Sequence, residues 1–122
     1  MVETTKAVEW RKEDGVTVLR LIANEVRESE QAVAISEELK KIAVGIGGRM
    51  VFCLDNVRFL SSTGISALVS FNRLLSSLKG ELKVCGIQPM ILHVMRAAGL
   101  DEALEIYKTE GDARAAFKAT EA

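Results

Sequence analysis

Residue types that catalytic and metal sites depend on are scarce in this sequence of 122 residues. It holds one histidine and two cysteines, and neither cysteine belongs to a Cys-x-x-Cys pair, so the ligands of a zinc site are missing. His93 lies in the apolar stretch MILHVM, which indicates a histidine on a helix surface or packed in the core rather than a catalytic base. We therefore expect no enzyme activity, no catalytic residues, no metal and no cofactor.

Long apolar runs and an excess of one charge are also lacking. No run approaches the roughly 20 apolar residues of a membrane-spanning helix, and the opening residues, MVETTKAVEW, contain no apolar signal core. The 16 basic and 17 acidic residues give a net charge of -1, without a basic block that would bind a phosphate backbone. These features predict a cytoplasmic protein that neither inserts into a membrane nor binds nucleic acid.

Both cysteines lie inside apolar runs, Cys53 in MVFCL and Cys85 in LKVCGI. Such positions are typical of buried thiols, which stay reduced in the cytoplasm. We therefore expect two buried free cysteines.

The residues that are present, 48% hydrophobic and 27% charged, are those of an ordinary globular protein. An Asp14-Gly15 turn between two alternating runs predicts an N-terminal β-hairpin, with an exposed edge at Trp10 that would allow a homodimer. Helical and strand patterns then alternate, and Ser29 is the expected N-cap of the first helix. The expected helices cover about residues 29–45, 64–79, 89–98 and 109–117, and the later strands about 50–55, 81–86 and 103–107.

The alternation of strands and helices predicts the α/β fold class. We expect a mixed sheet of about five strands, including the hairpin, packed with about four helices. No linker, repeat or low-complexity tract interrupts the pattern, so we expect a single domain over residues 1–122 with its core in about 7–119.

One stretch is chemically unusual: residues 55–65, DNVRFLSSTGI, between an apolar strand and an apolar helix. Ligands and partners of open α/β sheets usually bind at this end of a strand. Three consecutive hydroxyl residues stand where the helix is expected to begin, so Ser62 or Thr63 is predicted as its N-cap. The same hydroxyl would suit a phosphate, because the positive end of a helix stabilises anions.

The segment FLSSTGISAL, after an apolar strand ending in Asp55 and before an amphipathic helix, resembles the phosphorylation loop of STAS-domain anti-sigma-factor antagonists. The downstream segments ELKVCGI and QPMILHVMRAAGLDEAL also resemble that family, and the similarity runs from about Val16 to Phe117. STAS domains also occur in anion transporters and sensory scaffolds, so the resemblance is more specific for the domain than for the antagonist role.

The resemblance implies that Ser62, two residues before Gly64, is the phosphorylated serine, with Thr63 and then Ser61 as weaker candidates. Ser61 departs from the family, which has an aspartate there, and the segment ANEVRESE lacks the family's aspartate that is linked to nucleotide binding. Gly64 is predicted to let a partner or kinase approach Ser62 closely. The implied partner-binding residues are Asp55, Asn56, Ser61, Ser62, Thr63, Gly64 and Ile65.

Proteins of the family that this chain resembles bind an anti-sigma factor, often itself a serine kinase, and thereby release a sigma factor for transcription. The kinase phosphorylates the antagonist serine, and a separate serine phosphatase removes the phosphate. The resemblance therefore implies a bacterial partner-switching phosphoprotein in signal transduction, whose partners carry the catalytic machinery.

Two alternatives remain open, and a small enzyme is disfavoured. One is a STAS scaffold or sensory module that binds a protein partner or small ligand without phosphorylation, which the serine at position 61 favours. The other is a transporter-associated STAS module docked on a membrane protein. Neighbouring genes discriminate between them: an adjacent serine kinase and sigma factor support the antagonist, whereas transporter subunits support the transport role.

Overall fold

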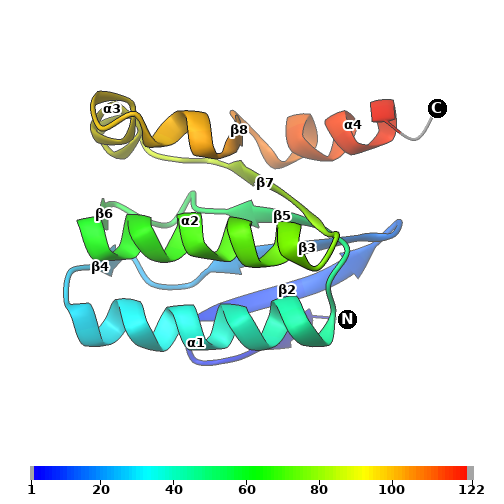
Figure 1. Cartoon of the computed structure of the whole chain (residues 1–122), viewed down its shortest axis with the longest axis horizontal. Coiled ribbons are helices and arrows are strands. Elements are labelled where there is room, and N and C mark those ends of the chain that lie inside the picture. Colours follow the sequence, from blue (N-terminus) through cyan, green and yellow to red (C-terminus); the bar gives the residue numbers. More distant parts are fainter. Residues whose placement is uncertain (1, 121–122) are drawn as a thin grey trace.

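A six-stranded mixed sheet forms the centre of the computed structural model, which describes residues 2–120 (Figure 1). The strand order is β1-β2-β3-β5-β7-β8, in which the first three strands are antiparallel and the later pairs are parallel. The expected mixed sheet is confirmed, with one further strand at its N-terminal edge. The strands are β1 (Val2–Thr4), β2 (Val8–Glu13), β3 (Val16–Leu21), β5 (Arg49–Cys53), β7 (Glu81–Cys85) and β8 (Glu105–Tyr107).

Four α-helices pack on this sheet, as expected. Figure 1 shows α1 and α2 running side by side in the lower half of the view, and α3 and α4 in the upper half. None of the helices that the structure describes is long and apolar enough to cross a membrane. The helices are α1 (Ser29–Gly45), α2 (Ser62–Ser77), α3 (Pro89–Ala97) and α4 (Glu110–Thr120), with a 3-10 turn at Leu100–Ala103.

Alternation along the strands divides the core between the two faces of the sheet. In β5, Met50 and Phe52 belong to the core under α1 and α2, whereas Val51 and Cys53 belong to the core under α4. The Phe52 ring meets Phe71 of α2 edge to face, with the ring centroids 5.9 Å apart. Strand β5 is apolar from Met50 to Cys53 because helices cover both of its faces.

A second, two-stranded parallel sheet was not predicted. It pairs β4 (Glu25–Val26) with β6 (Phe59–Leu60), which lie at the left of Figure 1 near the start of α2. Strands of two residues are too short to show an alternating pattern in the sequence. The pairing joins the segment before α1 to the loop before α2.

The N-terminal hairpin forms at the expected turn, but its edge does not lie where it was expected. Asp14 and Gly15 both have positive φ, 52° and 78°, as a two-residue hairpin turn requires. The expectation of a free edge at Trp10 is wrong, because β1 pairs with β2 there and Glu3 lies opposite Trp10. The edge of the sheet is therefore β1.

The helix starts were predicted with mixed success. The N-cap of α1 is Glu28 rather than Ser29, which is the first helical residue. Pro89 opens α3 as expected, since its missing N–H has no partner in a first turn anyway. At α4, the Thr109 hydroxyl accepts a hydrogen bond from the Asp112 N–H at 3.1 Å, which confirms the expected cap.

Candidate functional site

Backbone hydrogen bonds to β4 and its neighbours hold the loop between β5 and α2. The Arg58 N–H donates to the Asn24 carbonyl at 2.6 Å, and the Ser61 N–H donates to the Val26 carbonyl at 2.8 Å. These bonds extend the β4–β6 pairing to Ser61, the residue before α2. The start of α2 is therefore positioned by a segment more than thirty residues earlier in the chain.

Ser61, rather than Ser62 or Thr63, caps α2. Its backbone is extended, with φ -66° and ψ 165°, and its hydroxyl oxygen accepts a hydrogen bond from the Gly64 N–H at 3.2 Å. The Ile65 N–H donates to the Ser61 carbonyl at 2.9 Å and closes the first helical turn. The predicted cap was thus placed too far along the chain, because neighbouring hydroxyl residues have similar cap preference and the β4–β6 pairing decides between them.

Ser62 and Thr63 are the first and second residues of α2, and both are exposed. The first turn of α2 contains no acidic residue, so no carboxylate in that turn offsets the positive end of the helix dipole. Ser62 therefore places an exposed hydroxyl at a helix end where an anion is stabilised.

Gly64 is needed for close packing inside the chain. It is buried, and a Cβ atom built on it would lie 2.6 Å from Leu60 Cδ1 and 3.3 Å from Val26 Cγ1. The groups that approach Gly64 closely in this structure belong to β6 and β4, and the approach of a partner or kinase to Ser62 stays a prediction. Ile65 is also buried, at 3% exposure. Gly64 and Ile65 therefore support the expected partner-binding surface from beneath.

Asp55 and Asn56 follow β5, and both are exposed. The Asp55 carboxylate pairs with the Arg20 guanidinium of β3, and its carbonyl accepts a hydrogen bond from Gln88 Nε2 at 3.0 Å. Arg20 also lies 3.6 Å from the Glu110 carboxylate at the start of α4. Burial opposes the charge on Arg20, but the hydrogen bond to Asp55 and the nearby carboxylates raise its pKa overall, so the guanidinium stays charged. The ion pair holds Asp55 against the sheet.

Two exposed side chains beside the cap were not predicted, Phe59 and Arg27. The Arg27 guanidinium lies 4.3 Å from the centroid of the Phe59 ring and pairs with Glu25 at 3.0 Å. Phe59 remains 41% exposed. The parallel pairing of Glu25 with Phe59 brings these groups together, and no signal within residues 55–65 points to Arg27. Exposed aromatic rings and arginines are enriched in protein-binding surfaces.

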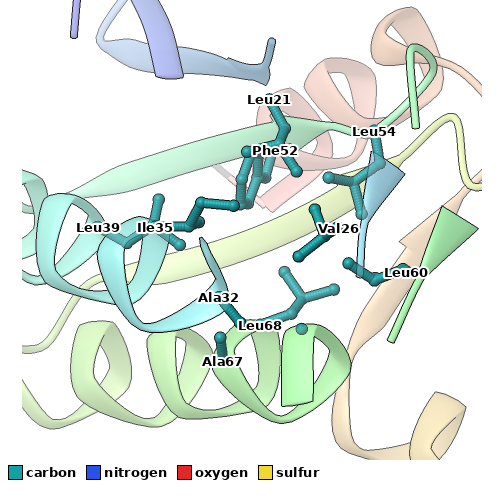
Figure 2. Close-up of a pocket in the computed structure, with 11 residues that line it drawn as sticks. Leu21, Val26, Ala32, Ile35, Leu39, Phe52, Leu54, Leu60, Ala67 and Leu68 are labelled. Atoms are coloured by element: carbon teal, nitrogen blue, oxygen red, sulfur yellow. The ribbon is translucent and has the colours of Figure 1, made fainter. Parts of the chain in front are cut away.

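A small apolar cavity lies behind this surface, between α1, α2 and the sheet (Figure 2). Its volume is about 20 Å³, room for roughly one water-sized group. Figure 2 shows carbon-only side chains converging on it, without the polar groups that would orient a metabolite. The cavity is lined by Leu21, Val26, Ala32, Ile35, Leu39, Phe52, Leu54, Leu60, Gly64, Ala67 and Leu68.

The single histidine and the two cysteines lie in the surroundings that their sequence neighbours indicated. His93 is exposed on α3, and Cys53 and Cys85 are buried and free. Within residues 2–120, no three or more His, Cys, Asp or Glu side chains gather in a way that could hold a metal ion.

Comparison with known families agrees with this architecture. The family model described as the STAS domain matches residues 7–113. The chain belongs to the STAS domain family. It is 28% identical over 64 residues to the anti-sigma F factor antagonist of Paenibacillus polymyxa, an alignment that covers 52% of this chain and 55% of the relative. The matched region thus spans about half the length of that curated relative.

Two solved structures show how far the STAS fold is shared. An anti-sigma factor antagonist from Mycobacterium paratuberculosis superposes with a TM-score of 0.76 at 25% identity, covering 88% of this chain and 89% of that one. The Bacillus cell fate determinant SpoIIAA in its phosphorylated form superposes with a TM-score of 0.64 at 18% identity, covering 91% and 99%. At 18% identity the second likeness concerns the fold alone.

Proposed function

We propose that this STAS protein is an anti-sigma-factor antagonist whose partner binding is controlled by phosphorylation of Ser62. In this proposal it binds an anti-sigma factor that is also a serine kinase, and a serine phosphatase restores the unmodified form. The consequence is regulation of sigma-dependent transcription. The names of the Paenibacillus and Mycobacterium relatives support the antagonist role, and SpoIIAA shows that a protein of the same fold exists in a phosphorylated form.

The observation that carries the proposal is the position of Ser62, exposed at the first residue of α2. The neighbouring Ser61 hydroxyl is already engaged by the Gly64 N–H, whereas the cap does not need the Ser62 hydroxyl. A phosphate on Ser62 would face the positive helix end, a stabilisation of about 0.3–1 kcal/mol. Thr63 is exposed too, but its hydroxyl sits on a β-branched carbon one residue further into the helix.

Ser61 is structurally compatible with the proposal, although the family that the chain resembles has an aspartate at this position. In this structure residue 61 is the N-cap of α2, and serine and aspartate are about equally good N-caps. The replacement therefore preserves the helix start that presents Ser62. What it removes is a negative charge beside the acceptor hydroxyl, which bears on kinase recognition rather than on folding.

Phosphorylation would oppose partner binding through charge and desolvation. A phosphoserine adds about -1.5 to -2 charge and three acceptor oxygens. Phe59, three residues before Ser62, has an exposed ring, which a partner that binds this segment would cover and desolvate. A protein moves from almost fully bound to almost fully free of its partner when the binding free energy changes by about 5.5 kcal/mol.

A non-phosphorylated STAS scaffold is the second candidate, and the serine at position 61 favours it because a kinase could require the missing carboxylate. In that case exposed residues of the segment, such as Asn56, Phe59, Ser62 and Thr63, would bind a protein partner constitutively. The two candidates share a surface and differ in whether Ser62 controls it.

Titration calorimetry with an anti-sigma factor from the same genome tests the proposal. Ser62→Ala is expected to bind like the unmodified protein, and Ser62→Asp at least tenfold more weakly, about 1.4 kcal/mol. A single carboxylate carries less charge than a phosphate, so phosphorylated protein should bind more weakly still. Ser66→Asp is the matched control, because Ser66 is exposed one turn further along α2. Equal affinity for the two aspartate variants would contradict the proposal.

A further inference from the structure

Cys53 and Cys85, which no part of the proposed function uses, lie directly opposite each other in the sheet. They are the last residues of β5 and β7, and their Cα atoms are partners in the parallel register. Their sulfur atoms are 3.4 Å apart, and each residue is only 1% exposed. Both are free thiols.

This placement suits a covalent bond between the two sulfurs. Neighbouring strands lie about 4.8 Å apart, within the Cα separation of about 4.4–6.8 Å that disulfides span. To form the bond, the sulfurs must approach from 3.4 Å to about 2 Å, which requires rotation of both side chains. The pair is therefore preorganised for oxidation.

The two thiols differ in acidity. The hydrogen bond between the two sulfurs lowers the pKa of Cys85, because the Cys53 thiol stabilises the Cys85 thiolate once Cys85 has lost its proton. The same neighbour, together with burial, raises the pKa of Cys53. Since the thiolate is the reactive form, Cys85 is the attacking group and Cys53 the resolving one.

Helix α4 covers the pair, and its first residue, Glu110, contacts Cys53. Ala113 and Phe117 pack in the same buried cluster as the two cysteines. At the border of this cover, the Glu110 carboxylate lies 3.7 Å from Cys53 Sγ, and its side chain is 26% exposed. Both cysteines are 1% exposed, which excludes bulky reagents, so their oxidation requires that a small neutral oxidant enter at this border.

The geometry points to Cys53 and Cys85 as a peroxide-sensitive dithiol that closes to an intramolecular disulfide. The Cys85 thiolate attacks one oxygen of hydrogen peroxide, breaks the O–O bond and becomes a sulfenic acid, releasing one water once the leaving hydroxide is protonated. The Cys53 sulfur then attacks the Cys85 sulfur, forms the S–S bond and displaces the second water. Two thiols and one peroxide thus give one disulfide and two waters.

Intact-mass analysis of the folded full chain, treated with hydrogen peroxide and then denatured and alkylated, tests this inference. We expect the number of alkylated thiols to fall from two to zero, with a peptide pair joined through Cys53 and Cys85. Dithiothreitol should restore both thiols. Oxidation of exposed Met90 adds oxygen but does not change the thiol count.

Single variants separate an intramolecular disulfide from other oxidation. Cys53→Ala and Cys85→Ala should lose the joined peptide, and Cys53→Ala should retain a sulfenic acid on Cys85 that a cyclic diketone traps. Wild-type protein that keeps both thiols, adds oxygen to sulfur without forming the joined peptide, or gives disulfide-linked dimers would overturn the inference. The wild-type measurement decides even if an alanine variant folds poorly.

Discussion

Ser61 and Ser62 are chemically identical neighbours with different surroundings. The Ser61 hydroxyl oxygen accepts a hydrogen bond from the Gly64 N–H, whereas Ser62 is the first helical residue and is exposed. One hydroxyl therefore stabilises the helix start while the next is available for modification. This division of roles predicts different consequences for the same substitution at the two positions.

Removing the Ser61 cap should lower the free energy of unfolding. Ser61→Ala is expected to cost about 0.5–2 kcal/mol in urea unfolding, because the Gly64 N–H loses its acceptor. Ser61→Asp should retain the wild-type stability, since aspartate is an equally good cap. Ser66→Ala is the control for an exposed serine within the helix. Equal stability of Ser61→Ala and wild type would show that the cap contributes nothing.

A large side chain at Gly64 should destabilise the protein from inside. In Gly64→Leu, the Cβ atom of residue 64 would lie only 2.6 Å from Leu60 Cδ1. We expect this overlap to lower the free energy of unfolding by about 1–3 kcal/mol. The double variant with Leu60→Ala should recover part of that loss, because it removes the obstructing branch. Urea unfolding of both variants measures the effect. If the double variant is no more stable than Gly64→Leu, Leu60 is not the obstacle.

At the scale of secondary structure, elements that bury long apolar surfaces were predictable and short ones were not. The runs around Cys53 and Cys85 identify β5 and β7, because central parallel strands are apolar on both faces. In contrast, β1, β4 and β6 have two or three residues each, and their pairing depends on distant segments. The missed β4–β6 pairing is also why the cap was placed wrongly.

Phe117 is a large buried side chain through which helix α4 packs on the sheet. Phe117 is fully buried, and Lys83 Nζ lies 4.6 Å from its ring centroid. Phe117→Ala is expected to lower the free energy of unfolding by about 3–5 kcal/mol, the usual cost of removing a buried ring. Lys118→Ala, at the exposed next position, should change it by less than about 0.5 kcal/mol. Similar values for both variants in urea unfolding would contradict this assignment.

At the scale of the whole molecule, the proposed site lies on a rigid support. The loop before α2 is tied to β4, and Asp55 is tied through Arg20 to β3 and the start of α4. We therefore expect a charge placed on Ser62 to leave the core unchanged. The order of helices and strands was predictable from periodicity, whereas the role of Ser62 rests on family resemblance and stays a prediction. The contact between Cys53 and Cys85 was not, because only the register of β5 and β7 brings them together.

This rigid arrangement predicts a local response to charge at Ser62. In two-dimensional NMR spectra, Ser62→Asp should shift backbone amide signals in β4, β6 and the first turns of α2, and leave those of α4 unchanged. Ser66→Asp serves as the comparison. Widespread shifts that reach α4 would show that the fold itself responds to the charge.

The most direct test of the central claim is phosphate mapping. Wild-type protein is incubated with ATP and an anti-sigma serine kinase from the same genome, and its intact mass and phosphopeptides are measured beside Ser62→Ala and Thr63→Ala. The account predicts one phosphate, located on Ser62, that is lost in Ser62→Ala and retained in Thr63→Ala. Equal labelling of Ser62→Ala and wild type, or no labelling of the wild type, would contradict it.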